Sequence, residues 1–147
     1  MVVNLIAALA ATAGYSLLVN VPRRLLAPAA LGGVLSWGAY LLLRGRIESV
    51  FYLLVLVGAA SAAYAEAAAK AAKAPATIFL ITGLIPLVPG GYVYYAMFAL
   101  VQNDFAAMRR YGLLTAQWAV GLAAGISLVA VLHQIAGNLR AKGRRTT

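Results

Sequence analysis

The sequence predicts an all-α integral membrane protein with five transmembrane helices, the fourth broken near the bilayer midplane. Of its 147 residues, 64% are hydrophobic and only 10% are charged, whereas soluble domains average about 45–50% apolar and about 25% charged residues. The apolar residues gather in runs about as long as a membrane span, which needs roughly 20 residues. A soluble domain of this size could not bury so much apolar surface, so the composition excludes that class.

Few residues in the chain could carry out chemistry. The chain has no cysteine, one histidine (His133) and three acids (Glu48, Glu66 and Asp104). Without cysteine there are no disulfides, thiolate nucleophiles or thiolate metal sites. We therefore expect no cofactor and no metal, and the scarcity of acids and histidine argues against an intramembrane enzyme.

The net charge of +9 does not indicate a nucleic-acid partner. Nucleic-acid binding requires basic residues on one face, whereas flanking lysines and arginines are typical of membrane spans. The basic residues lie in short clusters between the apolar runs: Arg23, Arg24, Arg44, Arg46, Lys70, Lys73, Arg109, Arg110, Arg140, Lys142, Arg144 and Arg145. We expect membrane lipids, and no nucleic acid, around this chain.

The first two runs predict spans at about residues 2–21 and 25–43. Pro22 ends the first, which we interpret as a retained span. A signal peptide is the alternative, because residues 11–13 faintly resemble a cleavage site, although a basic leader is missing. In the second run we expect Pro28 in the first turn, where its missing N–H does little harm.

The third run predicts a span at about residues 49–69 that continues as an alanine-rich helix. Alanine is the strongest helix former, so we expect the helix to project from the bilayer until Ala74 and Pro75 stop it. Glu66 and Lys70 are four residues apart with the acid first, which is the favourable order for an ion pair along a helix. This pair gives Glu66 a structural role.

The fourth run, residues 76–101, contains Pro86, Pro89, Gly90 and Gly91. Each proline removes a backbone donor and clashes with the preceding turn. At about 1.5 Å per residue the break would lie about 16 Å from Pro75, close to the midplane. Irregular backbone at that depth is tolerated where it is buried in protein or lines a wet cavity. A proline kink that only helps packing is the alternative.

A broken span is a common way for carriers to build a binding site, because the second half-helix offers unpaired N–H groups to an anion. The candidate substrate-binding residues are therefore Pro89, Gly90, Gly91, Tyr92 and Tyr95. Tyr92 and Tyr95 share one helix face, whereas Tyr94 points elsewhere.

Polar residues near the span ends are the candidates for coupling. Asn103 and Asp104 follow the fourth run, and an acid at a membrane span suggests function. The alternative for Asp104 is an ion pair with Arg109 or Arg110. His133 could relay protons, but no carboxylate is near it in sequence, which favours a packing role.

The fifth run predicts a span at about residues 111–136, so residues 1–139 form one transmembrane domain and residues 140–147 a basic tail. Small residues four apart, Ala10 with Gly14, Gly58 with Ala62 and Gly121 with Gly125, permit close helix packing and predict a bundle or an oligomer.

Five spans divide the basic residues unequally between the two sides of the membrane. Eight of them (Arg23, Arg24, Lys70, Lys73, Arg140, Lys142, Arg144 and Arg145) share one side, and the other four share the opposite side. Lysine and arginine are in excess on the cytoplasmic side of membrane proteins. This predicts an outer N-terminus and a cytoplasmic C-terminus.

Residues 82–97, followed by Gln102, Asn103 and Asp104, resemble the threonine/serine exporter family, and the small-subunit type fits best. Gly14-Tyr15, residues 21–24 and Gly32-Gly33 resemble its first two spans. The similarity extends to about residue 130.

This resemblance implies export of threonine and serine, or of a dicarboxylate such as succinate for the split type, across the inner (plasma) membrane. It also implies pairing with a large five-span subunit that carries a soluble domain; without that subunit we expect self-association. A non-transporting membrane scaffold or assembly protein is the alternative function.

Overall fold

The computed structural model describes residues 2–143, and within them every regular element is a helix. Six α-helices and one short 3-10 helix follow one another: α1 Val2–Leu18, α2 Arg23–Leu43, α3 Val50–Ala72, α4 Ala76–Leu84, η1 Ile85–Leu87, α5 Gly90–Val101 and α6 Phe105–Gly143. The all-helical fold predicted from the sequence is therefore confirmed for this part of the chain.

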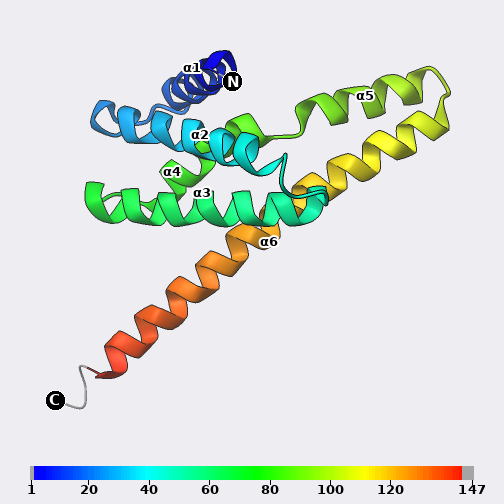
Figure 1. Ribbon diagram of the computed structural model, residues 1–147. Helices are drawn as coiled ribbons and strands as arrows, with labels where there is room; N and C mark the ends of the chain where they lie inside the picture. Colours follow the sequence, from blue (N-terminus) through cyan, green and yellow to red (C-terminus); the bar gives the residue numbers. More distant parts are fainter. Residues whose placement is uncertain (1, 144–147) are drawn as a thin grey trace.

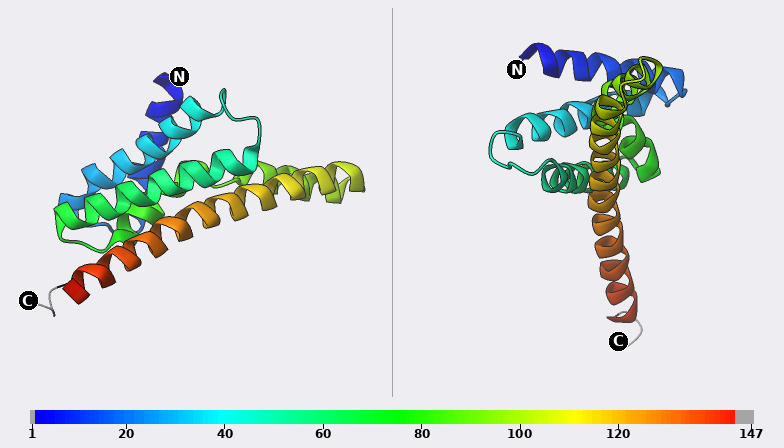
Figure 2. Two further views of the ribbon diagram at one scale, coloured as in Figure 1. Left: turned by 60° about the horizontal axis from the view of Figure 1, so that its bottom comes forward. Right: turned by 90° about the vertical axis from the view of Figure 1, so that its right-hand side faces the viewer.

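The helices form a small bundle with a long projecting hairpin (Figures 1 and 2). Helix α2 packs between α1 on one side and α3 and α4 on the other. Helix α6 crosses α3, and its first half runs antiparallel to α5, so that these two helices extend away from the rest (Figure 2). The contact between α3 and α6 holds the bundle to the hairpin.

Three helices, α2, α3 and α6, are long and apolar enough to cross a membrane. The α4–η1 segment and α5 pass the same test together, although they are bent by 51° at the break between them. Helix α1 is apolar but has only 17 residues. By length and composition, the described residues thus contain three candidate spans, or four if the bent pair counts as one, and the five-span count remains a prediction.

Glycines allow the backbones of α3 and α6 to pack directly against each other. A Cβ on Gly58 would lie 2.8 Å from the Leu122 carbonyl oxygen, and a Cβ on Gly125 would collide with the Val55 carbonyl oxygen. These positions belong to two of the three small-residue pairs identified in the sequence. The third pair differs, because a Cβ on Gly14 would meet nothing within 4 Å.

Two helices begin earlier than the sequence predicts. Helix α2 begins at Arg23, so Pro28 lies inside the helix and not in its first turn. The carbonyl oxygen of Pro28 accepts a 2.7 Å hydrogen bond from the hydroxyl of Tyr64 on α3. Helix α6 begins at Phe105 because Asp104 caps it there. It continues to Gly143, so the first four residues of the predicted tail are helical. Residues 144–147 of that tail lie outside the described residues.

Candidate functional site

The helix of the fourth run is interrupted between α4 and α5. Helix α4 ends at Leu84, one 3-10 turn follows, and Val88 and Pro89 lie outside any helix before α5 begins at Gly90. Neither Pro86 nor Pro89 can donate a backbone hydrogen bond, which explains why the helix cannot continue. Leu87 is fully buried and packs with Leu53 and Val57 of α3, so packing holds the interruption in place.

A hollow of about 250 Å³ lies beside this interruption. Residues of α2, of the break, of α5 and of α6 line it: Trp37, Tyr40, Pro86, Val88, Pro89, Gly91, Tyr92, Tyr95 and Trp118. We call this space the break hollow. The structure brings Pro89, Gly91, Tyr92 and Tyr95 of the candidate binding residues together here, whereas Gly90 is not among the lining residues and Tyr94 is 63% exposed on α5.

The start of α5 leaves two backbone donors available. The N–H of Gly90 donates to the carbonyl oxygen of Val88 at 2.8 Å, and the N–H of Val93 donates to that of Pro89 at 3.1 Å. Among the described residues, the N–H groups of Gly91 and Tyr92 have no backbone acceptor. Such groups carry the partial positive charge of a helix N-terminus. The N–H of Gly90, which was expected from the sequence as a third donor, already donates to Val88.

A chain of aromatic rings forms one wall of the break hollow. Trp37 stacks on Tyr40 with ring centroids 5.1 Å apart, Tyr40 lies 5.3 Å from Trp118, and Trp118 lies 5.7 Å from Tyr92. Trp37, Tyr40 and Trp118 were not predicted from the sequence as site residues, because they come from helices far apart in the chain. One signal was available, since the chain has only 2 tryptophans and both line this hollow.

Neither glycine at the start of α5 is needed for packing or for an unusual backbone. A Cβ added to Gly90 or Gly91 would have no neighbour within 4 Å, and neither residue has a positive φ. A side chain at Gly91 would therefore enter open space beside the hollow.

Asn103 and Asp104 form the tight turn between α5 and α6. Asn103 has a φ of 58°, and its N–H and that of Asp104 donate to the carbonyl oxygens of Leu100 and Ala99, which closes the end of α5. The Asp104 carboxylate then accepts a 3.0 Å hydrogen bond from the N–H of Ala107 and caps α6. Both residues are outside the lining of the break hollow.

The expected ion pairs of the two acids differ from those in the structure. Glu66 does not pair with Lys70 among the described residues; its Oε2 lies 3.6 Å from Nδ1 of His133 on α6. Asp104 forms a helix cap and no ion pair with Arg109 or Arg110. Glu66, Lys70, Lys73 and His133 line an open hollow at the far end of α3 from the break. The sequence missed the carboxylate near His133 because the two helices meet only in the fold.

The break hollow combines groups that suit a small zwitterion. Unpaired N–H groups bind a carboxylate, and the faces of tryptophan and tyrosine attract an ammonium group. Within the described residues, no lysine, arginine, aspartate or glutamate lines this hollow. Its chemistry is therefore that of binding by dipoles and ring faces.

The comparison with known proteins identifies the family of this chain. A family model described as "Threonine/Serine exporter, ThrE" matches residues 4–132, which include every residue that lines the break hollow. No curated protein and no solved structure matches the chain. Because the matched segment covers most of the chain, the protein belongs to the threonine/serine exporter family.

Proposed function

We propose that this protein is a subunit of a secondary transporter that exports a threonine- or serine-type amino acid across the inner (plasma) membrane. Its family is one of transporters, and we assign it no catalytic reaction. The solute's carboxylate binds the N–H groups of Gly91 and Tyr92, and its ammonium group lies against the aromatic wall.

The observation that supports this proposal is that unpaired N–H groups and aromatic rings surround one hollow of about 250 Å³. A zwitterion places one charge on each of these two features. Pro89 fixes the start of α5, and the hydroxyls of Tyr92 and Tyr95 are available to the solute's own hydroxyl. Specific recognition of a hydroxyl by such groups rejects analogues that lack it.

A dicarboxylate such as succinate is the second candidate solute. The start of α5 could hold one of its carboxylates, but no cationic side chain among the described residues lines the hollow to hold the other. The aromatic wall repels a second negative charge, since the ring faces are electron-rich. The hollow therefore favours an amino acid. A scaffold without transport is the remaining alternative.

We further propose that α1 is a span of its own, which brings the count to five with an outer N-terminus and a cytoplasmic C-terminus. Large apolar side chains are exposed along α5 and the first half of α6, among them Tyr94, Phe98, Phe105 and Leu113. Lipids and a partner, either a large five-span subunit or a second copy, would cover them. Contiguous apolar surface of this kind marks a membrane or protein contact.

Transport by the purified protein tests this proposal. The full chain would be reconstituted in liposomes, alone and with a large subunit encoded beside it, and loaded with radiolabelled threonine, serine or succinate. We expect release of threonine and serine well above that of empty liposomes, and little release of succinate. Release of succinate without release of threonine would show that the exported solute is a dicarboxylate and not an amino acid. No release in either preparation would favour the alternative function, a scaffold without transport.

A further inference from the structure

A second hollow adjoins the break hollow and shares two of its lining residues. It measures about 320 Å³, and Asn4, Ala7, Ala8, Ala11, Trp37 and Pro86 line it. We call it the α1 hollow. Trp37 and Pro86 line both spaces, so the two hollows meet at these residues.

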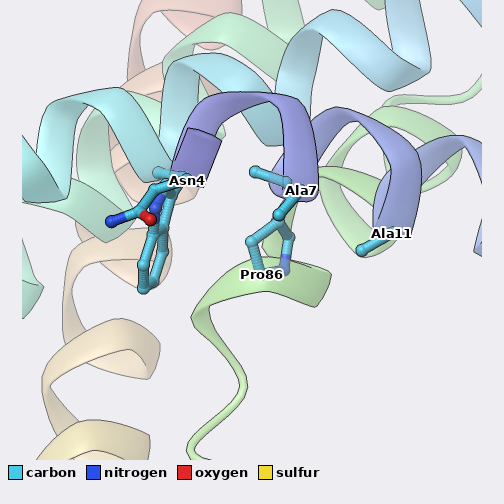
Figure 3. A pocket seen from close by; sticks show the side chains of 6 residues that line it. Asn4, Ala7, Ala11 and Pro86 are labelled. Carbon is cyan, nitrogen blue, oxygen red and sulfur yellow. The ribbon is translucent and has the colours of Figure 1, made fainter. Parts of the chain in front are cut away.

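The α1 hollow lies between α1 and the break (Figure 3). The ring of Pro86 on η1 faces α1 beside Ala7, with Asn4 and Ala11 on either side along the helix (Figure 3). Successive positions of this helix face carry alanine, and the short side chains leave the space open. Asn4 supplies an amide with two donors and an acceptor, and Trp37 adds an indole N–H to this lining.

Close packing of α1 on α2 keeps this space from collapsing by a simple shift of α1. A Cβ on Gly33 of α2 would collide with the side chain of Thr12 on α1, so the two helices already touch there. Thr12 is fully buried, and its hydroxyl donates to the Ala8 carbonyl oxygen at 2.8 Å. The contact at Thr12, which directly follows Ala11, therefore fixes the position of this part of α1 on α2.

We propose that the α1 hollow is a second binding station for the exported amino acid, separated from the break hollow by Trp37 and Pro86. This inference rests on the proposed function. The solute moves between the stations when the Trp37 side chain turns aside, and Asn4 binds its polar groups once they leave the N–H groups of α5. The volume of the α1 hollow, about 320 Å³, lies within the range of small-molecule pockets, which begins at roughly 300 Å³.

Cysteine protection tests this assignment, and the chain suits it because it contains no cysteine of its own. Ala7→Cys and Ala11→Cys place a thiol in the α1 hollow. Ala10→Cys is the matched control, since Ala10 lies on the same helix, is exposed like Ala7 and Ala11 and differs from them in being absent from the lining. Val88→Cys reports on the break hollow. Each full-length variant is labelled with a charged methanethiosulfonate in membranes opened to both faces, with and without threonine.

We expect rapid labelling at Ala7→Cys and Ala11→Cys, and slow labelling at Ala10→Cys, because we expect this position to face lipid. Threonine at about ten times its dissociation constant should slow the first two by up to about tenfold, the factor 1 + [L]/Kd. Trp37→Ala should raise the labelling rate at Ala7→Cys, whereas Trp37→Phe should leave it nearly unchanged because a ring still lies where the two hollows meet.

The outcomes separate this inference from the function beneath it. Protection at Val88→Cys without protection at Ala7→Cys and Ala11→Cys would overturn the second station and leave the proposed function intact. Labelling of Ala7→Cys and Ala11→Cys as slow as that of Ala10→Cys would likewise overturn it, because the space would then hold lipid. Absence of protection at all positions would overturn both.

Discussion

Nδ1 of His133 lies 3.6 Å from Oε2 of Glu66, and this contact ties α6 to α3 beyond their glycine crossing. Both side chains are partly exposed, the histidine at 46% and the glutamate at 30%. Exposed ion pairs contribute about 0.2–1 kcal/mol. The pair therefore joins the second half of α6 to α3 and contributes little to the overall stability of the protein.

Glu66→Gln should lower the melting temperature slightly, because it weakens a partly exposed contact between α3 and α6, and such contacts contribute about 0.2–1 kcal/mol. Thermal unfolding in mild detergent measures this, with Glu48→Gln as the control at an exposed acid. A melting temperature no lower than that of Glu48→Gln would show that the contact does not stabilise the protein.

Gly125→Ala should destabilise the protein strongly, by about 1–3 kcal/mol, because overpacking forces helices apart. Its Cβ would collide with the Val55 carbonyl oxygen of α3. Gly112→Ala is the matched control on the same helix, since a Cβ there meets nothing within 4 Å, and alanine should be neutral or stabilising by about 0.5–1 kcal/mol. Equal melting temperatures for the two variants would contradict the close crossing of α3 and α6.

Ser36→Ala and Ser61→Ala should show coupled losses. The two hydroxyls are buried and 2.8 Å apart, on α2 and α3. Hydrogen bonds between membrane helices average about 0.6 kcal/mol. A double-mutant cycle of unfolding free energies should give a coupling near that value, and additive losses would show that this contact does not hold α2 to α3.

Asp104→Ala should destabilise the α5–α6 turn by about 1 kcal/mol, because it removes the cap of α6. Asp104→Asn should keep both stability and export, since an amide oxygen can still accept the hydrogen bond from Ala107. Melting temperature and threonine release distinguish the two roles of this residue. Release abolished in Asp104→Asn with an unchanged melting temperature would assign Asp104 to coupling.

The sequence predicted the helices well and the site only in part. Proline and glycine act locally, so the interruption near Pro86 and the stop at Pro75 could be inferred from their positions. Contacts between helices could not: the aromatic wall needs Trp37 and Trp118, 81 positions apart in the printed sequence, to meet Tyr92. The same reason hid the partner of His133. The ion pair offered as the alternative for Asp104 does not form among the described residues, because the geometry of the turn directs its carboxylate to the N–H of Ala107.

The central claim is that the solute binds at the start of α5 in the break hollow, and a matched pair of glycine variants tests it most directly. Gly91 lines the hollow and Gly90 does not, yet a side chain has free space at either position. We therefore measure threonine release from liposomes by Gly91→Val and Gly90→Val, after confirming equal insertion and melting temperature. The account predicts that Gly91→Val abolishes release and that Gly90→Val retains most of it. Normal release by Gly91→Val would contradict it.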